Sequence, residues 1–326
     1  MADTYGREIN YLRISVTDRC NLRCRYCMPE EGIDLKNNNG ILSFEEIYRL
    51  VKIGAELGIR KVRLTGGEPL VRKNLTKLIK DINKLPQIDD IAITTNGVLF
   101  ADLAEELKHS GLNRVNFSVD TLAADKFKYI TRRNAFDKVK DALKKAIELK
   151  MDPVKINTVV IKGFNDNEIK DFVTLAYEYP FHVRFIEFMP IGDLLFWQKD
   201  KMMTNNEIKD NIKQDFDIAP AKQVRGNGPA QYYDIEGGKG TIGFISPMSN
   251  HFCSLCNRLR MTAEGKLRGC LYDKRETDLK SALRTGVSDE DLKQLFLRAI
   301  NLKPEKHQLN SGWGSENNRK MYQIGG

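Results

Sequence analysis

The stretch from Tyr11 to Cys27 decides the fold, because it joins a strand-like run directly to three closely spaced cysteines. It reads Tyr11-Leu-Arg-Ile-Ser-Val16 and, three residues later, Cys20-Asn-Leu-Arg-Cys24-Arg-Tyr-Cys27. The first run predicts a β-strand. The cysteines then lie on the loop that follows this strand, at the carboxyl end of the sheet to which it belongs.

Downstream of this stretch, the first two-thirds of the chain alternates between predicted strands and helices. The predicted strands cover residues 11–16, 61–64, 91–94, 114–119, 154–161 and 182–188. Helices are predicted over residues 43–57, from 74, from 102, over 135–149 and over 167–177. The first of these opens on Ser43-Phe-Glu-Glu46, which is a capping box. Six such repeats predict a parallel sheet with right-handed crossovers.

The length of this region favours an incomplete barrel. A closed barrel of eight strands and eight helices takes ~250 residues, and only about 190 are available here. The expected fold class is therefore α/β, a partial, six-stranded parallel β/α barrel; a doubly wound open sheet is the alternative. In either fold the chemistry lies at the carboxyl ends of the strands.

The character of the sequence changes after Met189-Pro190. Glycines become frequent, a short strand is predicted over residues 241–245, and a hairpin over residues 261–269. Two helices are predicted near residues 277–283 and 288–300. We therefore expect a C-terminal α+β extension, with domains at residues 1–236 and 237–326.

Composition restricts the class of protein. The chain has 326 residues, of which 41% are hydrophobic and 29% charged, so a large core can form. No uninterrupted apolar run exceeds four residues, whereas a membrane-spanning helix needs ~20. The polar N-terminus has no signal-peptide core, so the expected location is the cytoplasm. The net charge of +8 favours a polyanionic partner, or simply a solvated basic surface.

The first cysteine set is Cys20, Cys24 and Cys27. Clustered cysteines in a reducing compartment indicate metal or redox ligands rather than disulfides. Three thiolates can bind three irons of a [4Fe–4S] cube and leave the fourth iron open to a small molecule. The alternative is a structural zinc site, for which no fourth ligand lies nearby in the sequence.

The CxxxCxxC spacing, with an aromatic residue before the last cysteine, resembles the radical S-adenosylmethionine superfamily. The glycine-rich run Gly66-Gly67-Glu68-Pro69, placed just after the second predicted strand, agrees with this resemblance. The resemblance implies that the open iron binds S-adenosylmethionine and that an electron from the cluster cleaves it to a 5′-deoxyadenosyl radical. It also implies that S-adenosylmethionine is bound by Tyr26, Gly67, Ser118 and Met189.

The second cysteine set is Cys253, Cys256 and Cys270, with the spacing CxxC-x13-C. Three cysteines again favour a cluster with one open iron. The alternative is a Cys3His zinc site that uses His251. Arg258 and Arg260 follow the set and alternate with Leu259, so on a strand both arginines face the same side. Guanidinium groups suit phosphate and carboxylate.

Taken together, the two cysteine sets, the Cys-Asn-x-Arg-x-Arg run and the terminal Gly-Gly are similar to one branch of this superfamily. That branch cyclises GTP in the first step of molybdenum cofactor biosynthesis. The resemblance implies two [4Fe–4S] clusters, with GTP near the second, hydrogen abstraction from C3′ of the ribose, and attack of C3′ on C8 of guanine. It implies GTP contacts from Arg13, Arg63, Thr94, Lys155, Arg258 and Arg260, and catalytic roles for Arg258, Arg260, Gly325 and Gly326.

The residues themselves support part of this assignment. Arg13, Arg63 and Lys155 all lie on predicted parallel strands, and Thr94 ends another. Basic side chains that point into a barrel are costly unless an anion is present, and a triphosphate supplies that anion.

The same resemblance implies partners beyond GTP. They are an electron donor of flavodoxin or ferredoxin type and a cyclic pyranopterin monophosphate synthase that receives the product; a homodimer is left open. Neither a membrane nor a nucleic acid is expected as primary partner. Two other functions compete: a radical enzyme that modifies a peptide or another small molecule, and a metal-containing nucleic-acid-binding protein.

Overall fold

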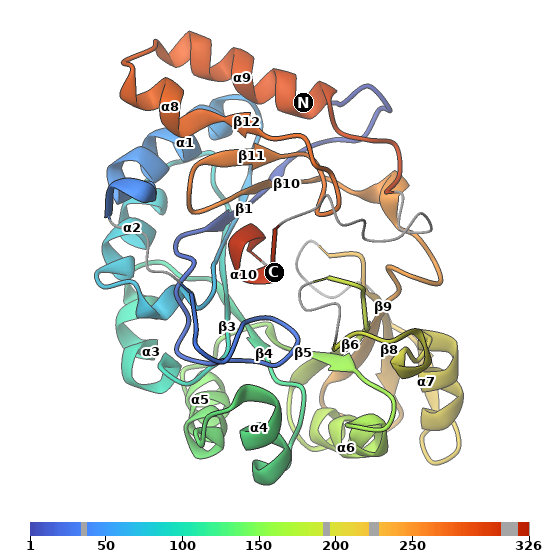
Figure 1. The fold of residues 1–326 in the computed structure, drawn as a ribbon. Helices are drawn as coiled ribbons and strands as arrows, with labels where there is room; N and C mark the ends of the chain where they lie inside the picture. Colours follow the sequence, from blue (N-terminus) through green and yellow to red (C-terminus); the bar gives the residue numbers. More distant parts are fainter. Residues whose placement is uncertain (34–37, 192–195, 222–227, 308–318, 326) are drawn as a thin grey trace.

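A single mixed β-sheet organises the chain in the computed structural model, which describes residues 1–33, 38–191, 196–221, 228–307 and 319–325. Within these residues the sheet has twelve strands, in the order β12-β11-β10-β1-β2-β3-β4-β5-β6-β9-β8-β7. Figure 1 shows the helices α1 to α6 outside the sheet and the C-terminal helix α10 in the middle of the molecule. The part of the chain that the structure describes contains no helix long and apolar enough to cross a membrane.

Six consecutive parallel strands form the middle of the sheet, as the sequence predicts. They are β1 (Tyr11–Ser15), β2 (Lys61–Thr65), β3 (Asp90–Thr95), β4 (Arg114–Ser118), β5 (Val154–Val160) and β6 (Phe181–Glu187). The connecting helices are α1 (Phe44–Glu56), α2 (Leu75–Ile82), α3 (Phe100–His109), α4 (Ala124–Thr131), α5 (Phe136–Glu148) and α6 (Ile169–Glu178). Because parallel neighbours end at the same edge, all six carboxyl ends lie on one side.

The predicted capping box at the start of α1 is present. The Ser43 hydroxyl accepts a hydrogen bond from the Glu46 backbone at 3.1 Å, and the Glu46 carboxylate accepts one from the Ser43 backbone at 2.7 Å. This pair satisfies two N–H groups that would otherwise lack partners at the helix start. The helix then packs its apolar face, including Ile47 and Leu50, into the core.

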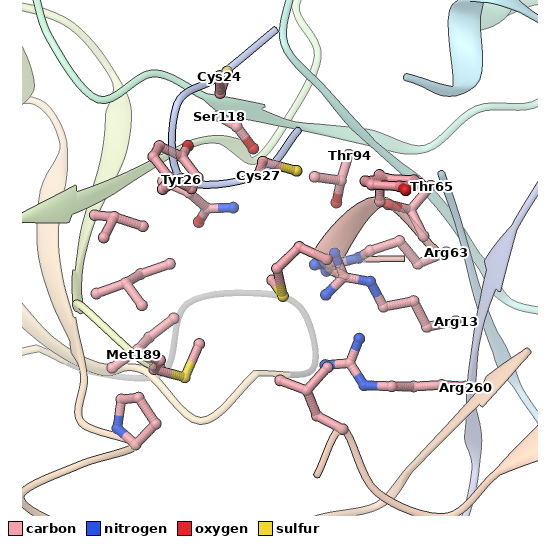
Figure 2. A pocket seen from close by; sticks show the side chains of 18 of the residues that line it. Arg13, Cys24, Tyr26, Cys27, Arg63, Thr65, Thr94, Ser118, Met189 and Arg260 are labelled. Carbon is pink, nitrogen blue, oxygen red and sulfur yellow. The ribbon is translucent and has the colours of Figure 1, made fainter. Parts of the chain in front are cut away.

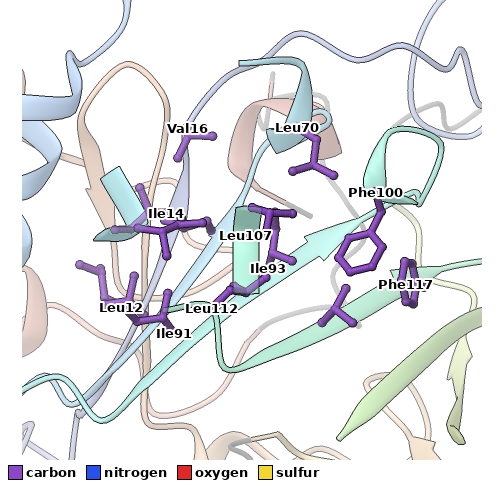
Figure 3. Packing of buried hydrophobic residues seen from close by; sticks show 14 of the residues in the cluster. Leu12, Ile14, Val16, Leu70, Ile91, Ile93, Phe100, Leu107, Leu112 and Phe117 are labelled. Carbon is purple, nitrogen blue, oxygen red and sulfur yellow. The ribbon is translucent and has the colours of Figure 1, made fainter. Parts of the chain in front are cut away.

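The core lies between the sheet and the outer helices. Leu12 and Ile14 of β1 pack there with Ile91 and Ile93 of β3 and Leu107 of α3, all nearly or fully buried (Figure 3). Side chains alternate between the two faces of a strand. The residues of β1 that lie between these core positions therefore point to the opposite face of the sheet, which leaves that face available for polar groups.

The C-terminal part extends the sheet at both ends. The strand β10 (Arg258–Met261) pairs in parallel with β1 and is followed by the antiparallel strands β11 (Lys266–Arg268) and β12 (Thr277–Asp278). At the other end, β9 (Thr241–Ile245) pairs in parallel with β6 and is followed by β8 (Gln231–Ile235) and β7 (Ile218–Pro220). The sheet thus has more strands than the six that the sequence predicts for the first region.

The remaining helices are short or lie near the C-terminus: α7 (Asn205–Ile212), α8 (Leu279–Arg284), α9 (Asp289–Asn301) and α10 (Met321–Ile324). The predicted helices at residues 277–283 and 288–300 are confirmed, although Thr277 and Asp278 form β12 and Asp278 caps α8. The sequence did not predict α4, α7, α10, β7, β8 or β12.

Candidate functional site

One large cavity lies on the inner face of the sheet. It holds about 2090 Å³ of atom-free space, counting its open mouth. Each of the six central strands contributes to its wall: Arg13 of β1, Arg63 of β2, Thr94 of β3, Ser118 of β4, Asn157 of β5 and Arg184 of β6. The wall of the cavity thus includes a residue from every central parallel strand.

Nearly all the residues that the sequence singled out meet in this cavity. Both cysteine sets line it, as do Tyr26, Gly67, Ser118, Met189, Arg13, Arg63, Thr94, Arg258 and Arg260. Lys155 and Gly325 are not among the lining residues, and Gly326 lies outside the described residues. Residues that are far apart in the sequence thus share one site.

The first cysteine set lies on the loop after β1, as predicted. A turn brings Cys24 and Cys27 together, since the Cys27 backbone donates a hydrogen bond to the Cys24 carbonyl at 2.9 Å. Burial raises the pKa of Cys20 to about 11 and that of Cys27 to about 12. All six cysteines are free thiols, half-buried in the wall. Thiols are the usual protein ligands of iron–sulfur clusters, so this donor set fits a cluster.

The run Gly66-Gly67-Glu68 crosses the backbone of this loop closely. A Cβ atom at Gly67 would lie 2.4 Å from the Arg19 carbonyl oxygen, and one at Gly66 would lie 2.4 Å from that of Thr17. Only glycine allows this approach. The two glycines therefore fix the glycine-rich run against the loop that carries the first cysteines.

Glu68 connects the glycine-rich run to the end of β3. Its buried carboxylate accepts hydrogen bonds from the Asn96 backbone at 2.7 Å, the Thr95 hydroxyl at 2.8 Å and the Leu70 backbone at 3.0 Å. Burial raises the pKa of Glu68 to about 7. The Asn96 side chain in turn donates to Asn21, within the cysteine loop, at 2.8 Å. Glu68 thereby helps to position that loop.

The wall around the first cysteines also carries aromatic and polar groups. The Tyr26 hydroxyl donates to the Asp120 carboxylate at 2.6 Å, and its ring packs edge-on against Phe188. Across the cavity, the Met189 sulfur accepts a hydrogen bond from the Tyr272 hydroxyl at 3.0 Å. Tyr26 is thus anchored at its hydroxyl end, and its ring forms part of the cavity wall.

The second cysteine set begins in the short turn Cys253–Leu255 and faces the same cavity. Burial raises the pKa of Cys256, but the positive charges of Arg258 and Lys303 outweigh burial and bring it down to about 6. Nδ1 of His251 donates a hydrogen bond to the Pro247 carbonyl at 2.9 Å, and its ring packs edge-on against that of His307. Among the described residues, no group of three or more His, Cys, Asp or Glu side chains is arranged to coordinate a single metal ion.

A row of arginines crosses three neighbouring parallel strands. Arg13 is the register partner of both Arg260 on β10 and Arg63 on β2. Figure 2 shows the three guanidinium groups pointing into the same space, with Met189 on the opposite side. The Nε atoms of Arg13 and Arg63 are buried without a hydrogen-bond partner.

Electrostatics in this row are unfavourable when no anion is present. Burial and the neighbouring charges of Arg260 and Arg63 lower the pKa of Arg13 well below its usual value. Burial likewise lowers the pKa of Arg63 and that of Arg260 to about 10. None of the three forms an ion pair with a carboxylate in the described ranges. Clustered, buried and unpaired guanidinium groups are the chemistry of an anion site.

Lys155 lies behind this wall. It is 2% exposed on β5, where burial and the charges of Arg184, Arg114 and Arg63 lower its pKa to about 6. Its neighbour Arg114 forms a buried ion pair with Asp90. The structure therefore brings Lys155 close to the arginines but not onto the cavity wall.

The C-terminal segment enters the same site. Met321 and Tyr322 of α10 line the cavity, and the Gly325 carbonyl accepts a hydrogen bond from Arg260 at 3.0 Å. Gly325 has a φ of +67°, and a Cβ atom there would lie 2.8 Å from Cγ2 of Thr65. Glycine is therefore required at this position both by the backbone conformation and by the packing.

Sequence reasoning missed several residues of this site. Arg184 lines the cavity, has a buried Nε atom without a partner and donates to Asn116 at 2.8 Å. It lies on a predicted strand, so the physical argument that supports Arg13 and Arg63 applies to it as well. Asn157, Asp120 and Tyr272 carried no comparable signal, because only the folded chain brings them to the cavity.

Comparison with known proteins agrees with this geometry. A family model described as the Radical SAM superfamily matches residues 14–176, and one described as Molybdenum Cofactor Synthesis C matches residues 181–309. Proteins named GTP 3′,8-cyclase are similar over 100% of both chains. They are 65% identical in Syntrophomonas wolfei, 52% in Desulforamulus reducens and 49% in Moorella thermoacetica.

Solved structures share the fold at low sequence identity. Streptococcus suis SuiB bound to the precursor peptide SuiA superposes with a TM-score of 0.62 at 15% identity, over 96% of this chain and 68% of that one. SuiB bound to S-adenosylmethionine gives a TM-score of 0.57 at 15% identity, over 88% of this chain and 68% of that one. These similarities concern the fold alone.

Proposed function

The chain belongs to the GTP 3′,8-cyclase family of the radical S-adenosylmethionine superfamily, and from that premise we propose how its residues carry out the reaction. The reaction converts GTP to (8S)-3′,8-cyclo-7,8-dihydroguanosine 5′-triphosphate, the first step of molybdenum cofactor biosynthesis. The enzyme is a radical lyase that uses S-adenosylmethionine and [4Fe–4S] clusters.

The first cluster is held by Cys20, Cys24 and Cys27, and a second by Cys253, Cys256 and Cys270. Two observations support both assignments: the thiols are free, and they line one cavity. Each set of three thiolates would bind three irons of a cube and leave the fourth iron without a protein ligand. When bound, the first cluster and S-adenosylmethionine together supply the one-electron chemistry that removes a hydrogen atom from the ribose of GTP.

S-adenosylmethionine binds against Tyr26, Gly67, Ser118 and Met189. Gly67 has no side chain, so its backbone packs closely against the cysteine loop and leaves space for a ligand to approach the backbone. Ser118 ends β4 with its side chain at the cavity, and Met189 offers an apolar surface opposite the arginine row. The hydrogen bond from Tyr26 to Asp120 fixes the ring as one side of the pocket.

GTP binds with its phosphates on the arginine row. Arg13, Arg63 and Arg260 present their guanidinium groups side by side, and this row is the single observation that carries the proposal. Thr94 adds a buried hydroxyl without a partner. A triphosphate would neutralise these charges and satisfy the orphaned N–H groups, which lowers the cost of burying them.

Arg258 and Lys155 complete the nucleotide site. Arg258 lines the cavity next to Cys256, where its charge acts on that thiol. Lys155 lies behind the wall, and a bound triphosphate would favour its charged form, because the anion offsets the burial and the arginine charges that lower its pKa. Arg258 and Arg260 also hold the nucleotide in reactive geometry, where small misplacements reduce the rate strongly.

The C-terminal tail, from Met321 to Gly325, closes the nucleotide site. Its Gly325 carbonyl is held by Arg260, and the backbone of Tyr322 lies at the Cys27 thiol. The tail therefore touches both a nucleotide-binding arginine and a ligand of the first cluster. The catalytic roles of Gly325 and Gly326 stay predictions.

The central strands form a partial, six-stranded barrel around the site. The supporting observation is that β1 and β6, the first and last of the six, contribute to the wall of one cavity. The division into a barrel at residues 1–236 and a cluster-binding extension at 237–326 stays a prediction. So do the cytoplasmic location, the flavodoxin- or ferredoxin-type donor, the cyclic pyranopterin monophosphate synthase and a homodimer.

Equilibrium binding of GTP and of guanosine to the anaerobic protein tests the proposal. We expect GTP to bind more tightly, and its advantage to shrink with added salt, because the arginine row recognises the phosphates. Arg13→Ala should remove most of that advantage, whereas Arg60→Ala, at an exposed arginine, should keep it. Equal affinities for GTP and guanosine would overturn the proposed phosphate site.

A further inference from the structure

A buried lysine lies directly behind the second cysteine set. Lys303 follows α9 and is 2% exposed. Its ammonium group donates hydrogen bonds to the Gly269 carbonyl at 2.6 Å, the Arg258 carbonyl at 3.1 Å and the Cys256 sulfur at 3.3 Å. All three hydrogen bonds of the ammonium group are thus directed at the segments that carry the second set.

Among the hydrogen-bond partners of Lys303, only the Cys256 sulfur can carry a negative charge. Burying an ammonium group is costly unless a negative group lies beside it. Two of its partners are neutral carbonyls, and no carboxylate within the described residues forms an ion pair with it. The remaining partner is the Cys256 sulfur, which becomes negative when it binds iron.

The backbone holds the lysine in this position. A Cβ atom at Gly269 would lie 3.0 Å from both Cα and Cβ of Lys303, so the lysine packs against the residue that precedes Cys270. From the N-terminal segment, Arg7 donates to the carbonyls of Cys253 and Glu305, both at 2.9 Å. Arg7 thus ties the chain just after Lys303 to the cysteine loop, which keeps the backbone of Lys303 beside the second set.

We propose that Lys303 is a positioning residue of the second cysteine set, which holds Cys256 and the approach to Cys270 and whose charge favours the reduced form of a cluster bound there. This inference rests on the proposed function in one respect, namely that the second set binds a [4Fe–4S] cluster. Hydrogen bonds to the sulfurs and nearby charge set the potential of such clusters. Reduction adds negative charge beside the ammonium group, so the lysine stabilises the reduced state more than the oxidised one.

The test isolates the second cluster in the full-length protein. Cys20, Cys24 and Cys27 are replaced by alanine, and the protein is reconstituted with iron and sulfide. Iron is counted, and reduction by dithionite is followed by electron paramagnetic resonance at controlled potential. In this background, Lys303→Met removes the charge and the donor, Lys303→Gln removes only the charge, and Lys303→Arg keeps both.

We expect the ratio of reduced to oxidised cluster at fixed potential to fall about tenfold in Lys303→Met and Lys303→Gln. That is a shift of about 59 mV for a one-electron couple. Lys303→Arg should stay close to the parent protein. Lys306→Met removes a charge at an exposed position three residues away and should leave the ratio unchanged.

The other outcomes of this experiment also distinguish between the inference and the proposed function. Loss of iron from the second set in Lys303→Gln, with unchanged circular dichroism, supports the holding role. Parent-like iron content and potential in both neutral variants would overturn the inference while leaving the proposed function intact. Zinc, or no iron, in the parent protein would overturn the assignment of the second cluster itself, and the inference with it.

Discussion

Arg13 and Arg260 are register partners on the neighbouring parallel strands β1 and β10. One comes from the first strand of the chain and the other from the C-terminal extension, yet their side chains reach into the same space (Figure 2). This pairing places like charges side by side, which destabilises the free protein. An anion bound to both arginines would offset this repulsion, and the proposed nucleotide site would then depend on both ends of the chain.

Replacing Cys24 by serine should abolish reductive cleavage of S-adenosylmethionine. The hydroxyl of serine is a poor substitute for the thiolate ligand of a cluster iron. The measurement is 5′-deoxyadenosine formed per hour in the presence of dithionite. Iron at the second set should be retained as the internal control, and deoxyadenosine at the parent rate in such a protein would disprove the assignment of the first set.

Replacing Cys256 by serine should reduce GTP conversion more than S-adenosylmethionine cleavage. Cys256 lies beside Arg258 and Lys303, whereas the first set follows β1, so the two functions should be separable. The quantity to follow is the ratio of cyclised nucleotide to 5′-deoxyadenosine. An unchanged ratio, in a protein still loaded at the first set, would contradict the separation.

Arg258→Ala and Arg260→Ala should each weaken GTP turnover without loss of iron. A hydrogen bond to a charged group contributes ~1.5–3 kcal/mol, which corresponds to roughly 10- to 150-fold in turnover at subsaturating GTP. We expect the larger loss in Arg260→Ala, because Arg260 also holds the Gly325 carbonyl. Unchanged kinetics in both variants would show that neither arginine contributes to GTP binding or turnover.

Gly325→Ala should lower product formation about tenfold while leaving both clusters in place. The left-handed backbone costs an alanine about 1–2 kcal/mol, and its Cβ atom would collide with Thr65. Gly286→Ala is the matched control, since Gly286 has a φ of +78° but open space around it. Deleting Gly325 and Gly326 should act like Gly325→Ala, and a parent rate in either would show that the tail has no part in cyclisation.

Local sequence signals predicted the central sheet and most of the site. The strands can be predicted because apolar residues alternate with polar ones in short segments such as Tyr11-Leu-Arg-Ile-Ser-Val16, and the cysteine sets because their spacing is unusual. Arg13 and Arg63 came from the resemblance, and one physical argument supports them, namely that a basic residue on a buried strand needs an anion. The same argument applies to Arg184 on β6, which shows that the signal was present but not fully used.

The rest depends on contacts between distant parts of the chain. The strand at residues 241–245 was predicted, but nothing local shows that it pairs with β6, or that β10 pairs with β1. Lys303 lies in an ordinary-looking segment before a proline, and only tertiary packing brings it to Cys256. The N-terminal anchor through Arg7 is invisible in the sequence for the same reason.

Transfer of deuterium tests the central claim most directly. The anaerobically reconstituted protein is incubated with S-adenosylmethionine, dithionite and GTP deuterated at C3′, and the products are analysed by mass spectrometry. The account predicts 5′-deoxyadenosine that contains one deuterium, together with 3′,8-cyclo-7,8-dihydro-GTP. Undeuterated 5′-deoxyadenosine with unchanged GTP, from a protein that holds both clusters, would contradict it.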